Sequence, residues 1–250
     1  MPRFFVDQSK IQEDCIVIQG NDVNHIRNVL RMRPGDELSL SDGRGTDYFC
    51  RILSIERDEI RLSIENSWNS YVELPVKLYL FQGLPKADKM ELIIQKAVEL
   101  GVYEIIPVRT NRVIVKLDEK KETKKIARWQ QIAEGGAKQS GRGIIPEVKP
   151  VMSFSEALAY AKNLEGVLIP YEKAEGIEKT REIIAGLKGR KSIGIFIGPE
   201  GGFSLEEVAK AEAFGFVRVS LGTAIFRAET AALFALNAIS YHYDLSGEVK

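Results

Sequence analysis

The sequence predicts an α/β protein in two parts: a small β-rich domain over residues 1–70 and a larger parallel-sheet domain over residues 71–250. Short apolar or alternating runs separated by turn residues fill the first part. Residues 67–74 fit a linker. Beyond it, buried strand patterns alternate with amphipathic helix patterns, and this order favours parallel strands joined by helices.

The first domain is expected to contain one helix, over residues 22–31, with Val23, Ile26 and Leu30 on a single face. Turn signals separate the strands. The expected strands cover residues 15–18, 37–41, 47–56 and 59–65, with turns at 33–36 and 41–45.

The second domain is expected to alternate strands with helices. Residues 135–143 are expected to form a polar, flexible and locally basic loop. This loop either grips a nucleic-acid or ribose-phosphate substrate or is simply a helix cap and surface loop. The expected strands cover residues 76–81, 104–108, 165–171, 191–197 and 218–221, and the helices cover 89–100, 123–137, 154–162, 177–187, 205–214 and 229–239.

The composition excludes several classes of protein. The formal net charge is zero, so any nucleic-acid surface must be a local patch. Two cysteines, Cys15 and Cys50, are too few for a disulfide framework or a zinc site. The N-terminus lacks the apolar core of a signal peptide, and no apolar run approaches the roughly 20 residues of a membrane span. We therefore expect a cytoplasmic protein with no metal and no membrane partner.

A glycine-rich turn at residues 198–202 is the strongest candidate for a ligand site. It follows a buried strand pattern and precedes a helix whose first residues, Ser204 and Glu207, form a capping box. Its three glycines allow positive φ angles and a close approach of a ligand to the main chain. Glu200 argues against a phosphate cradle and favours a ligand with hydroxyls or a positive centre. The alternative is a tight turn without a ligand.

His25, Arg27, Arg31 and Arg33 cluster on or beside the helix expected over residues 22–31. They form either a basic patch for an RNA backbone or a solvated helix face. Residues 1–70 have nine Lys or Arg against twelve Asp or Glu. On charge alone this balance favours the solvated face, because phosphate binding needs concentrated positive charge.

Two motifs resemble the paired signatures of the SPOUT methyltransferases: Gly198-Pro-Glu-Gly-Gly-Phe-Ser204 and Leu221-Gly-Thr-Ala-Ile-Phe-Arg-Ala-Glu-Thr-Ala231. More closely, the chain resembles the 16S ribosomal RNA uracil-N3 methyltransferase family, and the resemblance covers nearly its whole length. The departures are Thr223-Ala224, Phe226 and Ala228, where the family commonly has other residues. Further matches are Gln82-Gly-Leu-Pro-Lys86, Lys89-Met-Glu91, Lys96-Ala-Val-Glu-Leu-Gly101, Glu134 with Gln139-Ser-Gly-Arg142, and His25-Ile-Arg-Asn-Val-Leu-Arg31-Met-Arg33-Pro-Gly-Asp36.

The resemblance implies a fold and a function. It implies a PUA-like β-barrel RNA-binding domain at residues 1–70 and a SPOUT domain with a deep trefoil knot at residues 71–250. The implied molecule is a homodimer with its active site near the interface. The implied cofactor is S-adenosyl-L-methionine, the implied partner is 16S ribosomal RNA or the small ribosomal subunit, and the implied reaction methylates N3 of a specific uridine.

The resemblance also implies residue roles. Arg227 would stabilise the developing uracil anion or fix a phosphate, although a structural ion pair is the alternative. Glu229 is a possible base and could equally cap the last helix. The implied cofactor-binding residues are Leu168, Ile169, Pro170, Gly198, Pro199, Glu200, Gly201, Gly202, Leu221, Gly222, Ile225, Phe226 and Thr230, and the implied RNA-binding residues are Arg27, Arg31, Arg33, Lys86 and Arg142.

Three other functions stay open at this point. The chain could be a SPOUT RNA methyltransferase that acts on a ribose 2′-hydroxyl, or a non-enzymatic RNA-binding protein of ribosome assembly. A Rossmann dinucleotide enzyme is the weakest alternative. No Gly-x-Gly-x-x-Gly lies near the first strand, and Glu200 is misplaced for a pyrophosphate.

Overall fold

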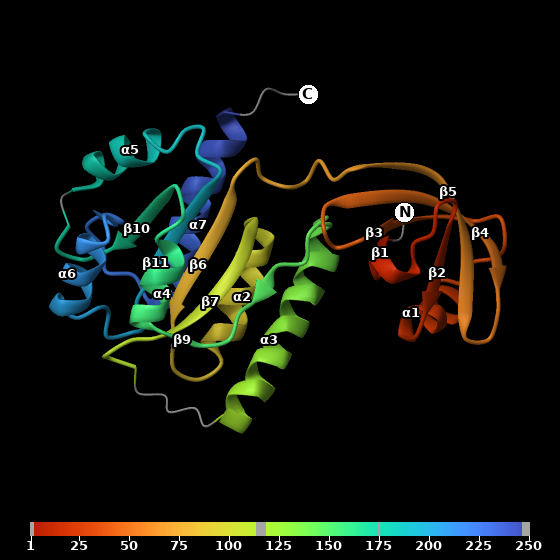
Figure 1. Cartoon of the computed structure of the whole chain (residues 1–250), viewed down its shortest axis with the longest axis horizontal. Coiled ribbons are helices and arrows are strands. Elements are labelled where there is room, and N and C mark those ends of the chain that lie inside the picture. The colour runs from red at the N-terminus through yellow and green to blue at the C-terminus, as the bar shows by residue number, and fades with distance from the viewer. Residues whose placement is uncertain (1–2, 114–118, 175, 247–250) are drawn as a thin grey trace. The chain divides into compact units, whose positions relative to one another are not determined.

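The chain folds into two compact units (Figure 1). The computed structural model describes residues 3–113, 119–174 and 176–246. One unit consists of Met1–Glu73 with Ala137–Ile145, and the other consists of Leu74–Gly136 with Pro146–Lys250. The first unit therefore includes a short segment from the middle of the chain.

The first unit is built on a five-stranded sheet with the order β1-β3-β4-β5-β2, in which only the β1–β3 pair is parallel. The pairing of β4 with β5 shifts register twice, and such bulges bend a strand and increase its twist. The sheet curls around a core that includes Leu38, Leu40, Ile60 and Leu62. The strands are β1 (Arg3–Phe5), β2 (Cys15–Gln19), β3 (Glu37–Ser41), β4 (Thr46–Ile55) and β5 (Glu59–Asn69), and η1 (Gln8–Lys10) is a 3-10 turn.

The predicted helix of the first unit is shorter and less regular than expected. It consists of α1 (Asn21–Asn24) and a π-helical segment, η2 (His25–Val29). Val23 and Ile26 are buried, whereas Leu30, which was expected on the same face, is 38% exposed. The wider π turn changes the angular spacing, and Arg31 then leaves the helix with a φ of +55°.

The second unit has a sheet with the order β12-β10-β11-β6-β7-β8, and all of its strand pairs are parallel, as predicted. β9 also pairs with β7. The two shortest strands, β8 and β9, have too few residues for a periodic signal. The strands are β6 (Lys77–Gly83), β7 (Val102–Arg109), β8 (Glu147–Val148), β9 (Met152–Ser153), β10 (Gly166–Pro170), β11 (Ser192–Ile197) and β12 (Val217–Val219).

Helices cover both faces of this sheet (Figure 1). Phe81 and Phe196 stack at 4.3 Å on one face, in a core shared with α4 and α6. On the other face, α7 contacts β6, β11 and α2. In the described ranges no helix is both long and apolar enough to cross a bilayer. The helices are α2 (Lys89–Glu99), α3 (Glu119–Ser140), α4 (Phe154–Ala161), α5 (Ile177–Ala185), α6 (Leu205–Ala213) and α7 (Ala228–Ser246).

The flexible loop expected at residues 135–143 was wrong. Helix α3 continues through Gly135 and Gly136 to Ser140. A Cβ on Gly136 would lie 3.3 Å from Val98 on α2, so glycine here permits close helix packing instead of ending the helix. Gly141 then takes a φ of +70°, the usual conformation after a helix end.

Candidate functional site

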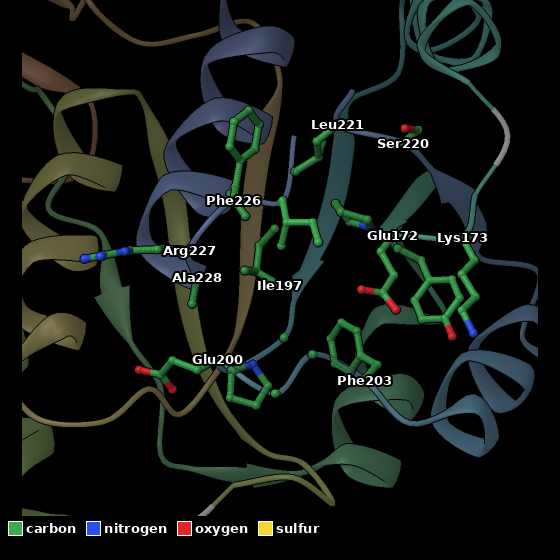
Figure 2. A pocket seen from close by; sticks show the side chains of 18 of the residues that line it. Glu172, Lys173, Ile197, Glu200, Phe203, Ser220, Leu221, Phe226, Arg227 and Ala228 are labelled. Atoms are coloured by element: carbon green, nitrogen blue, oxygen red, sulfur yellow. The ribbon is translucent and has the colours of Figure 1, made fainter. Parts of the chain in front are cut away.

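A cavity of about 600 Å³ lies at the carboxyl ends of three neighbouring parallel strands of the second unit (Figure 2). Its walls come mainly from the loops that follow β10, β11 and β12. The strand order changes direction between β6 and β11, because the chain first adds β7 and β8 on one side and later adds β10 to β12 on the other. Ligands of open α/β sheets bind at the carboxyl edge beside such a switch point.

The glycine turn after β11 brings the main chain close to itself. A Cβ on Gly198 would lie 2.9 Å from the Cα of Gly202, which is too close for any other residue. Of the three turn glycines only Gly202 has a positive φ, +64°, so the expectation of positive φ at Gly198 and Gly201 was wrong. Glycine is needed at Gly198 and favoured at Gly201 because a Cβ would lie too close to Gly202 or would crowd Arg112. A Cβ on Gly83 of β6 would lie 2.7 Å from Pro199, so this turn also packs against the end of β6.

The capping box predicted at the start of α6 is confirmed. Ser204 Oγ accepts from the backbone N–H of Glu207, and the Glu207 carboxylate accepts from that of Ser204 at 2.8 Å. The second Glu207 oxygen accepts from the N–H of Asn111, just after β7. The next residue, Arg112, donates from Nη1 to the Gly201 carbonyl at 2.6 Å. Thus the segment after β7 forms a further wall of the cavity.

Lys89 connects the glycine turn to the start of α7. Its ammonium lies 3.1 Å from Glu200 Oε1 and 3.3 Å from Glu229 Oε2 at the start of α7. The second contact is an ion pair whose geometry misses that of a hydrogen bond. The Glu200 carboxylate also accepts from the backbone N–H of Lys86. Figure 2 shows the Glu200 side chain directed away from the other labelled side chains, so its backbone, not its carboxylate, lines the cavity.

These contacts shift the pKa values of both Glu200 and Lys89. Burial raises the pKa of the Glu200 carboxyl. Hydrogen bonds from its own backbone N–H and from that of Lys86, with the Lys89 ammonium, outweigh this effect and bring the pKa below its usual value. The hydrogen bond to Glu200 raises the pKa of Lys89, against a smaller opposing effect of burial. At neutral pH the site therefore holds an ionised Glu200 beside a charged Lys89.

The loop after β12 is held by hydrogen bonds at its first residue, Ser220, and exposes apolar side chains near its last residues. The Thr180 hydroxyl donates to the Ser220 carbonyl and accepts from its N–H, both at 2.9 Å. Ile225 is 87% exposed, and the Phe226 ring packs on Phe234 with centroids 5.1 Å apart. The guanidinium of Arg227 extends away from the cavity, although its residue lines it (Figure 2).

Most of the predicted cofactor-binding residues line this cavity, and three do not. Leu168 and Ile169 are buried within β10, and Thr230 lies on α7. Of the two predicted catalytic residues, Arg227 lines the cavity and Glu229 does not. The predicted residues in its walls are Pro170, Gly198, Pro199, Glu200, Gly201, Gly202, Leu221, Gly222, Ile225 and Phe226.

Several lining residues were absent from the prediction. Tyr171, Glu172 and Lys173 directly follow β10, so extending the predicted loop past its strand would have included them. Lys89 and Arg112 carry no local signal, because their partners lie far along the chain. The other additional residues are Ile197, Phe203, Leu205, Ser220, Thr223, Ala224, Ala228 and Ala231.

The predicted RNA-binding residues lie in both units. Arg27, Arg31 and Arg33 are exposed in the first unit, and Arg27 donates to the carbonyls of Glu56 and Arg57. Lys86 is exposed in the second unit. Arg142 is only 3% exposed and forms an ion pair with Glu73 at 2.6 Å. An RNA contact by Arg142 stays a prediction, and it would have to replace this ion pair. Over the described parts of the chain, no three His, Cys, Asp or Glu side chains gather as a metal ion would require.

Comparisons with known proteins identify the family. The RNA methyltransferase domain family matches residues 72–240, and the RNA methyltransferase PUA domain family matches residues 18–65. Ribosomal RNA small subunit methyltransferase E of Bacillus subtilis (strain 168) is 38% identical, over 98% of this chain and 98% of that protein. The chain belongs to the ribosomal RNA small subunit methyltransferase E family.

Other members of the methyltransferase E family are also similar over nearly their full length. The protein from Mesomycoplasma hyopneumoniae (strain 232) is 34% identical, over 94% of this chain and 97% of its own. The crystal structure of the Neisseria gonorrhoeae member bound to S-adenosyl methionine is 33% identical with a TM-score of 0.82. It covers 97% of this chain and 98% of its own.

Membership of the methyltransferase E family confirms the resemblance stated from the sequence. It also confirms the predicted combination of a PUA-like part with an α/β methyltransferase part. The dinucleotide-enzyme alternative is not favoured.

Proposed function

We propose that this chain transfers the methyl group of S-adenosyl-L-methionine to N3 of a specific uridine in 16S ribosomal RNA of the small subunit. The observation that carries the proposal is the glycine-walled cavity at the carboxyl ends of β10, β11 and β12, in a chain of the methyltransferase E family. The similar Neisseria gonorrhoeae structure is bound to S-adenosyl methionine.

The residues of the cavity fit this cofactor. At Gly198, Gly201 and Gly202 the turn presents backbone groups without a Cβ, and a Cβ on Gly198 would collide with Gly202. Backbone N–H and C=O groups can read an adenine edge without a side chain. The apolar side chains of Ile197, Leu221 and Phe226 suit the faces of a purine ring. The three loops of the cavity would therefore hold the adenine and the ribose.

When bound, S-adenosylmethionine supplies an electrophilic methyl group attached to a positively charged sulfur. The chain's own part is to place uracil N3 in line with that methyl and to favour loss of the N3 proton. We propose that the Arg227 guanidinium stabilises the uracil anion, since it is charged at any pH that the reaction would use. Its exposure and its direction away from the cavity leave it accessible to RNA.

We propose that the Glu229 carboxylate accepts the N3 proton. The ion pair with Lys89 stabilises the ionised carboxylate and so opposes its protonation. Glu229 would give up the ion pair with Lys89 in order to take a proton. An alternative acceptor is solvent. Glu229 would then act as an anchor of α7.

We propose that the first unit, with the exposed Arg27, Arg31 and Arg33, contacts the RNA, and that Lys86 does so beside the cavity.

The domain boundaries proposed are residues 1–70 and 71–250. The expected homodimer, the trefoil knot and the cytoplasmic location belong to the same proposal. The apolar residues Ile225, Phe234 and Tyr241, which are 87%, 42% and 63% exposed, support a partner surface.

The test is nucleoside analysis of ribosomal RNA from cells that lack this chain. We expect 3-methyluridine to be missing from the small-subunit RNA and to return when the purified protein and S-adenosylmethionine are added. Loss of a 2′-O-methyl nucleoside instead would overturn the N3 assignment. An unchanged nucleoside profile, with no stabilisation of the protein by the cofactor, would overturn the enzymatic role. A ligand at about 100 times its Kd should stabilise by about 2.7 kcal/mol.

A further inference from the structure

Positive charge is concentrated in one stretch of this neutral chain. Residues 109–128 have eight Lys or Arg against three Asp or Glu, whereas the whole chain has 35 of each. We propose that the basic face of α3, formed by Lys120 and Lys124, binds the phosphate backbone of the RNA substrate together with Arg112. This inference rests on the proposed function and adds a binding surface to it.

Helix geometry turns these lysines outward. At 3.6 residues per turn, Lys120 and Lys124 lie on the side of α3 opposite to Trp129, which is 3% exposed. Both lysines are exposed, and among the described residues neither has a carboxylate within ion-pair distance. Glu122 points to the other side and pairs with Arg109 at 3.1 Å. Glu122 is therefore neutralised by Arg109, while Lys120 and Lys124 face solvent.

Two ion pairs place this face at the edge of the sheet where the cavity opens. The Arg109–Glu122 pair holds the first turns of α3 to the carboxyl end of β7. Three residues after Arg109, Arg112 donates to Gly201 in the cavity wall. Further along α3, Arg128 pairs with Glu91, two residues after the cavity residue Lys89. RNA that delivers a nucleotide to the cavity would pass beside this part of α3.

The charge pattern differs from that of an ordinary solvated helix. Solvated helix faces commonly place an acid four residues from a lysine, which stabilises the helix. Here Lys120 precedes Lys124 by four residues. Like charges at this spacing destabilise a helix. An anionic partner would relieve that repulsion, and an RNA backbone supplies regularly spaced anions.

Lysines suit a contact that positions RNA without reading its sequence. An ammonium group is a compact point charge on a flexible stem, and it binds phosphate without the planar geometry that base recognition uses. Lys125 lies outside this face, because its ammonium lies 5.9 Å from the ring of the buried Trp129. Residues 1–70, by contrast, have more acidic than basic residues. The second unit therefore has its own electrostatic anchor for the substrate.

The experiment compares the full-length wild type with the double variant Lys120→Gln/Lys124→Gln. The matched control is Lys179→Gln/Lys188→Gln, which removes two exposed lysines from α5 and the turn after it. Binding to a 16S ribosomal RNA transcript is measured by filter retention over a range of salt concentrations, without turnover. Cofactor affinity is measured by calorimetry.

We expect the α3 variant to bind RNA on the order of tenfold more weakly at about 0.1 M salt. The magnitude of its log–log salt slope should fall by about 1.4–1.8, because each lost phosphate contact removes about 0.7–0.9. Its cofactor affinity should match the wild type. RNA binding no weaker than that of the control pair would overturn the inference. Because binding is measured directly, this result is separate from whether 3-methyluridine is formed.

Discussion

Lys89 carries a single positive charge between a carboxylate of the glycine turn and a carboxylate at the start of α7. Its ammonium contacts Glu200 of the glycine turn and Glu229 of α7, while the backbone of Lys86 holds Glu200 from a third direction. The side chain itself is about one-third exposed, so bulk water screens part of its attraction. We expect Lys89 to matter mainly because it holds the Gly198–Gly202 turn in place, and the backbone of this turn would contact the cofactor.

Replacing Lys89 by Met should therefore weaken cofactor binding. The variant keeps most of the side-chain volume but leaves Glu200 and Glu229 without their cation. We expect the Kd for S-adenosylmethionine to rise on the order of tenfold, as for the loss of one partner of a charged pair. The maximal rate at saturating cofactor should stay within a few-fold. Calorimetry and steady-state kinetics measure the two effects.

Two further variants separate positioning from general damage. Lys89→Arg keeps the charge and should retain most of the affinity. Lys96→Met removes a lysine from the same helix that pairs with Glu99, and it should leave cofactor binding unchanged. Wild-type affinity in Lys89→Met would contradict the role given to this residue.

Glu200 should make stability depend on pH in the acid range. Its folded pKa lies below the usual value of 4.5. The ionised carboxylate therefore contributes stability above the pKa of the unfolded chain, and this contribution is lost as the pH falls through the lowered folded pKa. We expect wild type and Glu200→Gln to differ by a constant free energy of unfolding at neutral pH, and the difference should shrink below about pH 4.5. Urea denaturation at a series of pH values measures it. A difference independent of pH would contradict the assignment.

Arg227→Ala should abolish methyl transfer and leave cofactor affinity within a few-fold of the wild type. The guanidinium extends away from the cavity, so its removal should leave the cavity walls in place (Figure 2). Transfer of a labelled methyl group to small-subunit RNA and calorimetry check the two expectations. Arg218→Ala is the control, because that exposed arginine pairs with Glu212 away from the cavity. Near-normal turnover in Arg227→Ala would reject a catalytic role.

Among single residues, the sequence indicated those of the site whose role depends on neighbours close in the chain. The glycines of the turn and the capping residue Ser204 act through neighbours a few positions away, so spacing alone pointed to them. Lys89 acts through Glu200 and Glu229, which lie more than a hundred residues away along the chain. No local pattern encodes such a contact.

Among the elements, the segment after α3 shows how a polar sequence can be buried. Arg142 is 3% exposed, and its guanidinium donates to both carboxylate oxygens of Glu73. Glu73 also accepts from the backbone N–H groups of Gly143 and Ile144. This carboxylate therefore fastens residues 142–144 within the first unit.

Glu73→Gln should strongly destabilise the first unit. It takes the carboxylate charge of Glu73 away from a buried guanidinium, and breaking a buried pair costs about 3–5 kcal/mol. The control is Glu37→Gln, because the Glu37–Arg51 pair is more than 40% exposed at both side chains and should cost less than about 1 kcal/mol. Urea unfolding followed by circular dichroism measures both variants. Equal midpoints for the two would contradict the prediction.

Hydrophobic periodicity predicted most elements to within a few residues, including β3 (Glu37–Ser41), α2 and α6. Periodicity failed where glycine can either end a helix or allow close helix packing. Gly135 and Gly136 resemble a helix end, yet they continue α3 because Gly136 packs against Val98. It also missed β1, whose three residues give no measurable period.

For the whole molecule, the neutral net charge conceals an uneven distribution. The positive stretch at residues 109–128 balances acidic residues elsewhere, so bulk composition excluded global steering and gave no view of the local surface. The sequence pattern also did not predict the order of the strands in the sheet. The pattern predicts parallel strands, but the place of β6 between β11 and β7 depends on contacts between distant residues. The trefoil knot implied by the resemblance stays a prediction.

Finally, the exposed apolar residues of the second unit predict that the protein is a dimer in solution. Phe234 and Tyr241 lie seven residues apart on α7, on the same side of the helix, and they are 42% and 63% exposed. The Phe226 ring packs against Phe234, which connects this surface to the cavity loop after β12. Burying such side chains against a second copy would remove apolar area from water.

The double variant Phe234→Glu/Tyr241→Glu should sediment as a monomer, because two carboxylates cannot be buried without partners. We expect it to lose methyl transfer as well, since the loop of Arg227 adjoins this surface. Leu53→Glu is the control, because Leu53 is 56% exposed on β4 of the first unit and should leave the oligomeric state unchanged. A wild-type protein that is monomeric at micromolar concentration, yet fully active, would show that each chain's cavity works without a second copy.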